Sequence, residues 1–140
     1  MSDFNERIVE EFRANGGTVT TAGFGDRLVL LHTTGAKTGA ARISPVMGFP
    51  EPGGWLVVAS KAGAPDNPAW YANLVAHPHA SVEAPAGGGV ETVEVTARAL
   101  SGDEYAAAWK RVVADAPGFD DYRVKAANRT IPVLMLTRRG

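Results

Sequence analysis

Cysteine is absent from the sequence. This absence excludes disulfide bonds, thiolate catalysis and thiolate-bound metals, and it is compatible with a reducing cytosol. No stretch of the chain approaches the roughly 20 apolar residues that a membrane-spanning helix needs. The first residues include acids where a signal peptide has a basic and then an apolar segment. We therefore expect a cytoplasmic protein without a membrane span.

An excess of charge is also missing, because 14 basic residues accompany 15 acidic ones. The net charge of -1 creates no overall field that favours nucleic acid or an anionic membrane. Any preference for anions must therefore arise from a local cluster. Apolar residues make up 45% of the 140 residues, which is ordinary for one soluble globular domain. We expect a single domain over residues 1–140.

The apolar pattern predicts an N-terminal amphipathic helix within residues 1–16, ended by Gly16 and Gly17. Strands are expected at 27–32, 42–49, 55–60, 80–84, 90–100 and 131–137, and further helices at 68–76, 101–115 and 119–127. Turn residues 51–54 predict that 42–49 and 55–60 form a hairpin. Ser101 followed by Glu104 resembles a capping box. Strands that are mostly joined as hairpins predict an α+β protein, an antiparallel six-stranded barrel with peripheral helices.

The turn between the first two strands is unusually cationic. Lys37, Thr38 and Arg42 place two cations and a hydroxyl within six positions, beside backbone N–H groups that glycine leaves approachable. This content is typical of an anion site. A second loop carries Ser60 and Lys61, and a tilted barrel can bring such strand ends together around one groove. Solvated surface charges are the alternative interpretation of these cations.

Other kinds of site fit the sequence less well. Residues before Lys37 lack the G-x-x-x-x-G-K spacing of a phosphate-binding loop, and no helix follows. The glycines at 87–89 are typical of a hairpin loop. His77 and His79 flank a proline without a clear third ligand, so surface histidines are favoured over a metal site. No nucleophile-elbow motif accompanies a serine.

Four motifs, in this order, resemble the deazaflavin-dependent nitroreductase family, which uses coenzyme F420. They occupy residues 34–45, 59–64, 67–74 and 129–133. The resemblance extends from about Leu30 to the C-terminus. It implies a split β-barrel in which the deazaflavin lies in a groove and its phosphate and oligoglutamate tail lead outward. Split barrels often pair, so the resemblance makes a homodimer plausible.

The resemblance also implies roles for individual residues. Lys37, Thr38 and Arg42 match the family's contacts to the phosphate and tail. The residues that would line the deazaflavin or close its pocket are Pro45, Val46, Ala59, Ser60, Lys61, Gly63, Trp70 and Tyr71.

The chemistry of the cofactor agrees with this resemblance. No protein side chain delivers a hydride, so a reductase needs a cofactor that the protein orients. F420 carries a phosphodiester and several carboxylates, which call for arginine, lysine and amide donors, whereas FMN ends in one phosphate. Two basic clusters beside small-residue loops suit the longer anion.

The substrate pocket departs from the family pattern. Ala116 and Phe119 stand where tyrosines are expected, and only Tyr122 remains. Since Phe119 cannot donate a hydrogen bond, the departure disfavours nitroimidazole reduction. We expect an F420H2-dependent reductase of an electrophilic small molecule (enone, quinone or nitro compound), with Tyr122 as proton donor or substrate contact. The alternatives are a non-catalytic protein that binds F420, a flavin or an apolar ligand on the same barrel, and an FMN-dependent oxidoreductase.

Overall fold

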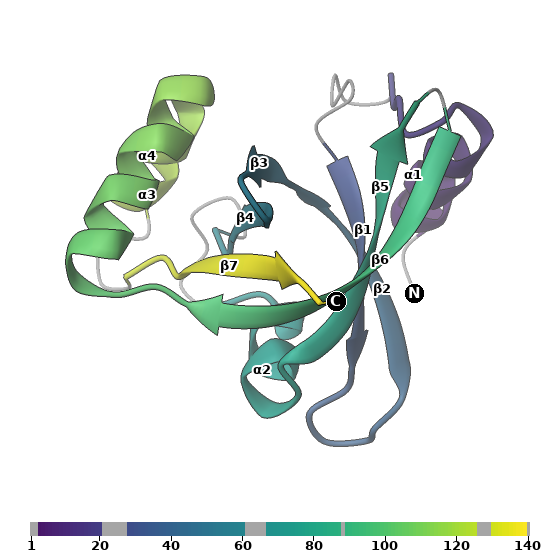
Figure 1. Cartoon of the computed structure of the whole chain (residues 1–140), viewed down its shortest axis with the longest axis horizontal. Coiled ribbons are helices and arrows are strands. Elements are labelled where there is room, and N and C mark those ends of the chain that lie inside the picture. The colour runs from purple at the N-terminus through teal and green to yellow at the C-terminus, as the bar shows by residue number, and fades with distance from the viewer. Residues whose placement is uncertain (1–2, 21–27, 61–66, 88, 126–129, 140) are drawn as a thin grey trace.

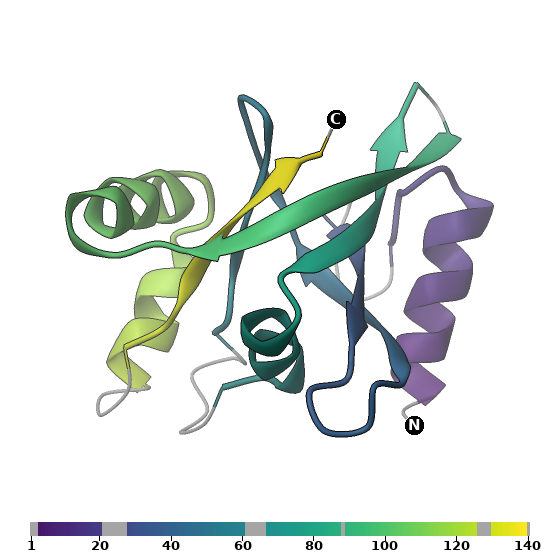
Figure 2. The same cartoon turned by 60° about the horizontal axis from the view of Figure 1, so that its bottom comes forward.

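The computed structural model describes residues 3–20, 28–60, 67–87, 89–125 and 130–139. Within these ranges the chain forms one antiparallel sheet of seven strands, with helices on its outside and at one end (Figures 1 and 2). None of the described helices is long and apolar enough to cross a membrane. The elements in chain order are α1 (Asp3–Ala14), β1 (Leu28–Thr34), β2 (Ala41–Met47), β3 (Phe49–Glu51), β4 (Gly54–Val58), α2 (Ala69–Ala76), β5 (His79–Ala86), β6 (Gly89–Ala99), α3 (Gly102–Asp115), α4 (Gly118–Lys125) and β7 (Val133–Arg138).

The sheet curls because its two edge strands are neighbours in the sequence. The strand order is β2-β1-β5-β6-β7-β4-β3, so β2 and β3 lie at opposite edges. Only Gly48 separates them along the chain. A sheet whose two edges are joined by one residue has to bend back on itself. The predicted antiparallel barrel with peripheral helices is confirmed, with seven strands in place of six.

The extra strand arises because the predicted strand 42–49 is interrupted at Gly48. The part before Gly48 pairs with β1, with Val46 opposite Val29, and only the part after it pairs with β4, with Phe49 opposite Leu56. The predicted hairpin of 42–49 with 55–60 was therefore wrong over most of its length. Gly48 is buried, and a Cβ there would lie 2.9 Å from a methyl carbon of Val29. Such a close approach explains why glycine occupies the point where the chain changes partners.

Apolar side chains form three cores around the curled sheet. The first fills the inside of the barrel and is closed at one end by α2 through Trp70 and Leu74. The second lies between β3, β4, β7 and the helices α3 and α4. The third lies between α1 and the outer face of β1. Because both faces of β4 are covered, all of its residues are buried, as expected for a continuous apolar run.

The helices form where the sequence predicts them, but the capping box was wrong. Ser101 is the N-cap residue of α3, yet its side chain makes no capping hydrogen bond. The Glu104 carboxylate that a capping box requires instead accepts two hydrogen bonds from Arg98, at 2.9 and 3.0 Å. A bidentate arginine is a stronger partner for a carboxylate than a single backbone N–H.

Candidate functional site

Two cavities adjoin along β2 at the end of the barrel where α2 lies. The first, called the apolar pocket, has a volume of about 230 Å³, and the second, called the cationic pocket, about 400 Å³. Trp70 lines both, and β2 contributes consecutive residues to the two of them. The apolar pocket is lined by Pro45, Val46, Met47, Val58, Ser60, Pro68, Trp70, Phe119 and Tyr122. The cationic pocket is lined by Gly35, Ala36, Lys37, Thr38, Arg42, Ile43, Ser44, Ala69, Trp70, Ala72 and Asn73.

The β1–β2 turn contributes Lys37, and the start of β2 contributes Arg42, to the lining of the cationic pocket. The Gly35 N–H donates to the Ala40 carbonyl at 2.8 Å, and the Gly39 N–H donates to the Gly35 carbonyl at 2.9 Å. Gly39 has a φ of 72°, a conformation that glycine adopts without strain. The Thr38 hydroxyl oxygen accepts the Ala40 N–H at 3.2 Å, which leaves its own O–H available as a donor. The turn is thus closed by its own bonds, with Lys37 exposed near its tip.

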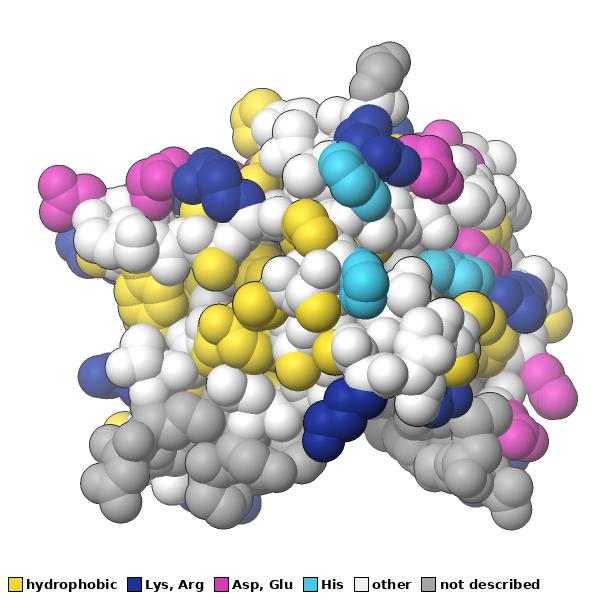
Figure 3. All heavy atoms as spheres, turned by 90° about the horizontal axis from the view of Figure 1, so that it is seen from below, with side chains coloured by type: hydrophobic (Ala, Val, Ile, Leu, Met, Phe, Trp, Pro, Cys, Tyr) yellow, Lys and Arg dark blue, Asp and Glu magenta, His cyan; other side chains and the backbone are white. Residues whose placement is uncertain are grey.

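Lys37 and Arg42 make no ion pair with any other residue that the structure describes. Most described arginines do have a carboxylate partner; they are Arg13, Arg98, Arg111, Arg123, Arg138 and Arg139. A cation on a cavity wall without a neighbouring acid is available to an anion from solution. Figure 3 views the face on which α2 and the β1–β2 turn lie, and Lys and Arg side chains appear there beside hydrophobic ones.

Aromatic rings form one wall of the apolar pocket. The rings of Phe119 and Tyr122, both from α4, meet edge to face at 5.4 Å between centroids. Phe119 also meets Phe49 edge to face at 5.7 Å. These contacts fix the position of the Tyr122 ring, while its hydroxyl makes no hydrogen bond to another described residue. Among the described residues that line this pocket, Ser60 also carries a hydroxyl, and it is 9% exposed.

Asn73 links the two walls of the cationic pocket, and the sequence analysis missed it. Its Oδ1 accepts the Ala36 N–H at 2.9 Å, and its Nδ2 donates to the Thr33 hydroxyl at 3.2 Å. Asn73 is 8% exposed and Thr33 4% exposed, so the hydrogen bond between them is shielded from water, whereas the bond to the exposed residue Ala36 is only partly buried. An amide inside an otherwise apolar helical stretch was the signal that could have pointed to it.

The structure brings most of the sequence-predicted residues to these two pockets. Ala59 and Tyr71 do not line them. Ala59 is fully buried and its N–H donates to the Pro132 carbonyl at 2.9 Å, while Tyr71 packs against the core inside the barrel. Lys61 and Gly63 lie outside the described residues. Met47, Val58 and Pro68 line the apolar pocket although the sequence analysis did not single them out.

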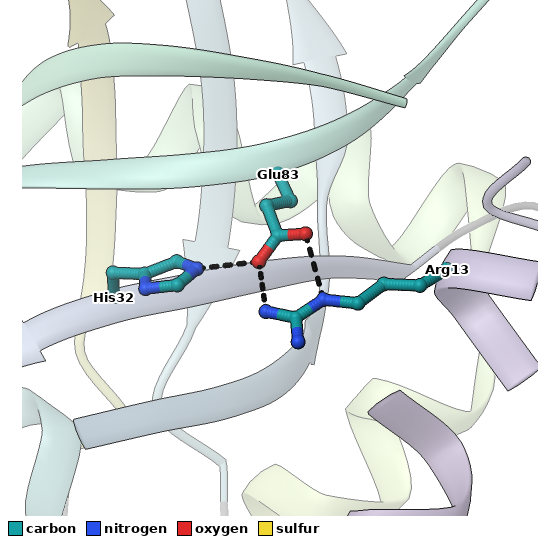
Figure 4. Close-up of polar contacts among 3 residues, drawn as sticks. All are labelled: Arg13, His32 and Glu83. Atoms are coloured by element: carbon teal, nitrogen blue, oxygen red, sulfur yellow. Dashed lines mark hydrogen bonds and ion pairs between the residues drawn. The ribbon is translucent and has the colours of Figure 1, made fainter. Parts of the chain in front are cut away.

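A buried carboxylate that lines neither pocket lies between Arg13 and His32 (Figure 4). Glu83 on β5 accepts two hydrogen bonds from Arg13 of α1, at 3.0 and 2.7 Å, and lies 2.6 Å from Nε2 of His32. The hydrogen-bonded Arg13 guanidinium lowers the pKa of Glu83 below its ordinary value, and His32 acts in the same direction against the opposing effect of burial. This network ties α1 to the sheet.

The remaining histidines lie at the surface. His77 and His79 are exposed, and the His79 Nδ1 lies 2.9 Å from the Arg139 guanidinium. Among the described residues, no group of three histidines and acids lies close enough together to hold a metal ion.

Comparison with known proteins identifies a family whose model matches nearly the whole chain. A model of the F420H(2)-dependent quinone reductase family matches residues 5–138. An F420H(2)-dependent quinone reductase of Mycobacterium tuberculosis is 37% identical over 114 residues, which cover 79% of this chain and 73% of that protein. A putative F420H(2)-dependent quinone reductase of the same organism is 32% identical over 111 residues, which cover 79% of this chain and 89% of that protein.

Solved structures agree with these relatives. An F420-H2 dependent reductase, FDR-A, superposes with a TM-score of 0.69 at 40% identity and covers 79% of this chain and 93% of its own. A second structure, described as a domain-swapped dimer, has a TM-score of 0.69 at 37% identity, covering 94% and 96%. The predicted F420-dependent split-barrel family is thereby confirmed. The chain belongs to the family of F420H(2)-dependent quinone reductases, oxidoreductases whose cofactor is coenzyme F420.

Proposed function

We propose that this chain reduces a quinone with F420H2, holding the deazaflavin ring and substrate in the apolar pocket and the anionic tail in the cationic pocket. One observation carries the proposal: an apolar cavity and a cavity with two unpaired cations adjoin at Trp70. F420 has the same two parts, a flat ring and a long chain of negative charges. A ligand with one phosphate, such as FMN, would leave much of the cationic pocket unused.

The tail site rests on Lys37 and Arg42. The guanidinium of Arg42 suits a phosphate or carboxylate through paired N–H donors, and the ammonium of Lys37 acts as a point charge. The Thr38 O–H adds a neutral donor from the same turn. These groups fit a phosphodiester followed by glutamate carboxylates.

When bound, reduced F420 supplies a hydride, and the rest of the reaction depends on this chain's own residues. The apolar wall excludes water, which strengthens hydrogen bonds inside the pocket. Tyr122 is our candidate for donating a proton or a hydrogen bond to a substrate oxygen, because it lines the pocket, its ring packs against Phe119, and its hydroxyl has no partner among the described residues. Ser60 is a second donor at the pocket wall.

A quinone fits this pocket better than a nitro compound. The described lining is mostly apolar, and it includes Phe119 at a position where the family resemblance leads us to expect a tyrosine hydroxyl. A flat ring with two carbonyl oxygens needs apolar contact and few donors, whereas a nitro group that gains charge needs several. Ala116 is half-buried against the second core and does not line the pocket. Enones have one carbonyl oxygen and rank second.

The test is a fluorescence titration with F420 and with FMN, followed by assays of quinones, enones and nitro compounds with F420H2. Replacing both Lys37 and Arg42 with alanine should weaken F420 binding strongly, since hydrogen bonds to charged groups contribute about 1.5–3 kcal/mol each. The control pair is Arg7→Ala with Lys110→Ala, which removes the same charges from exposed positions on α1 and α3.

Each outcome decides one part of the proposal. Equal affinity of the Lys37/Arg42 variant and the control would reject the tail site. Binding of F420H2 without turnover of any substrate would favour a non-catalytic binding protein, and tighter binding of FMN would favour a flavin enzyme. Turnover of nitro compounds in preference to quinones would reject the substrate class.

We also propose that two copies of the chain pair in solution and that the protein is cytoplasmic. A similar solved structure is described as a domain-swapped dimer, which supports pairing. Light scattering after size-exclusion chromatography should give twice the chain mass of 14.7 kDa. A single monomeric species at micromolar concentration would reject the dimer.

A further inference from the structure

The affinity of the cationic pocket depends on how its two walls are placed relative to each other. One wall is the β1–β2 turn with Lys37, and the other is α2 with Ala69, Trp70 and Ala72. The internal hydrogen bonds of the turn close the turn but do not attach it to α2. Something else must therefore set the distance between the cation and the helix.

Asn73 makes that connection. The N–H that it accepts belongs to Ala36, the residue directly before Lys37, and the hydroxyl that it contacts belongs to Thr33 at the end of β1. One side chain thus holds the strand end and the first residues of the turn against the helix. The bond to Thr33 is buried, so losing it would leave a shielded polar group without a partner, and this cost holds the Asn73 side chain in place to accept the Ala36 N–H.

We propose that Asn73 is a positioning residue for the tail of F420, an inference that rests on the proposed function. It holds the backbone of Ala36, and through it Lys37, at a fixed distance from α2. Its effect is confined to the cationic pocket, since it does not line the apolar pocket. Removing it should weaken binding of the anionic tail and leave binding of the ring unchanged.

The experiment compares two ligands on each variant: F420, and the deazaflavin nucleoside that lacks the phosphodiester and glutamates. Dissociation constants come from fluorescence titration. Asn73→Ala should bind F420 about tenfold more weakly, the effect expected for the loss of one buried and one partly buried hydrogen bond, while its affinity for the nucleoside stays within about twofold of wild type.

Thr33→Val separates positioning from direct contact. Thr33 does not line either pocket, and valine has the same shape without the hydroxyl. This variant should lose part of the preference for F420, about threefold, and the double variant should be no worse than Asn73→Ala because both act through one linkage. Val19→Ala, in the core beneath α1, is the control that lowers stability without touching the site.

The outcomes separate this inference from the proposed function. Wild-type protein that prefers F420 over the nucleoside, with the same preference in both variants, would overturn the inference alone. An equal loss for both ligands would also overturn it, since Asn73 would then support only the fold. If Asn73→Ala does not fold, the preference of Thr33→Val decides. Wild-type protein with no preference for F420 would overturn the tail site itself, and this inference with it.

Discussion

At the scale of single residues, Tyr122 carries a hydroxyl that makes no hydrogen bond to another described residue, among neighbours that are phenylalanines. If the hydroxyl donates the proton, we predict that Tyr122→Phe lowers kcat with a quinone by about 10²-fold or more. About 10²-fold is the lower end of what general acid catalysis typically contributes. F420 affinity should not change. The measurement is steady-state kinetics beside a fluorescence titration.

Tyr71→Phe is the matched control, because Tyr71 follows Trp70 in α2 but lines neither pocket. It should leave kcat unchanged. If Tyr122→Phe retains full kcat, the proton comes from another donor, with Ser60 next in line.

Glu83 leads to a prediction about pH. Its pKa in the folded protein lies below the ordinary value of 4.5, chiefly because Arg13 donates hydrogen bonds to the carboxylate. A carboxyl with a lowered pKa contributes stability above its unfolded pKa, and this contribution is lost as the pH falls through the folded value. Glu83→Gln should therefore reduce the free energy of unfolding by about 1–3 kcal/mol at pH 7, with a smaller difference at lower pH.

Urea unfolding at pH 7 and at several acidic pH values would measure this difference. Glu104→Gln is the control, since Glu104 also pairs with an arginine but lies at the exposed surface. A difference that grows as the pH falls would contradict the assigned sign.

At the scale of elements, two adjacent glycines in the β3–β4 hairpin make contrasting demands. A Cβ on Gly54 would lie 1.8 Å from the Leu136 carbonyl oxygen, so β7 itself would have to move. Gly53 has a φ of 88° but open space around it. We predict that Gly54→Ala costs more than about 3 kcal/mol, whereas Gly53→Ala costs about 1 kcal/mol of backbone strain.

Thermal and urea unfolding of both variants would test this contrast. Equal costs would mean that the separation between β4 and β7 adjusts readily, against the close approach described here.

The same scale shows what sequence reasoning could reach. Helices and most strands were predicted from their periodicity, because that signal is local. The change of partner at Gly48 was not, since a strand's partner depends on which surfaces meet after the chain bends. The capping box failed for the same reason, because Arg98 competes for Glu104 from the strand before the helix.

The charged residues of the candidate site could be predicted from the sequence, but the connection between α2 and the β1–β2 turn could not. Lys37 and Arg42 could be singled out because two cations and glycines in one turn already suggest an anion site. The amide of Asn73 in a mostly apolar helix could have marked the residue, but its role could not be predicted, because that role exists only once α2 lies against the β1–β2 turn. Resemblance to known motifs supplied the cofactor, which composition alone would not have indicated.

At the scale of the whole molecule, ligand binding should appear as stability. A ligand that binds only the folded state stabilises it by about 2.7 kcal/mol at 100 times its dissociation constant. We predict that F420 raises Tm markedly at such concentrations and that FMN at the same concentration raises it less. Differential scanning fluorimetry measures both, and the Lys37/Arg42 double variant should lose the shift.

The joint at Gly48 bears on how such a chain can evolve. Gly48 connects the edge strand β2 to the edge strand β3, so the circumference of the barrel is limited by this connection and not by hydrogen bonds between the two edge strands. Inserting a few residues at this connection would let β2 and β3 move apart while every pair of hydrogen-bonded strands kept its register. A longer connection at this point would therefore give a wider barrel with the rest of the scaffold unchanged.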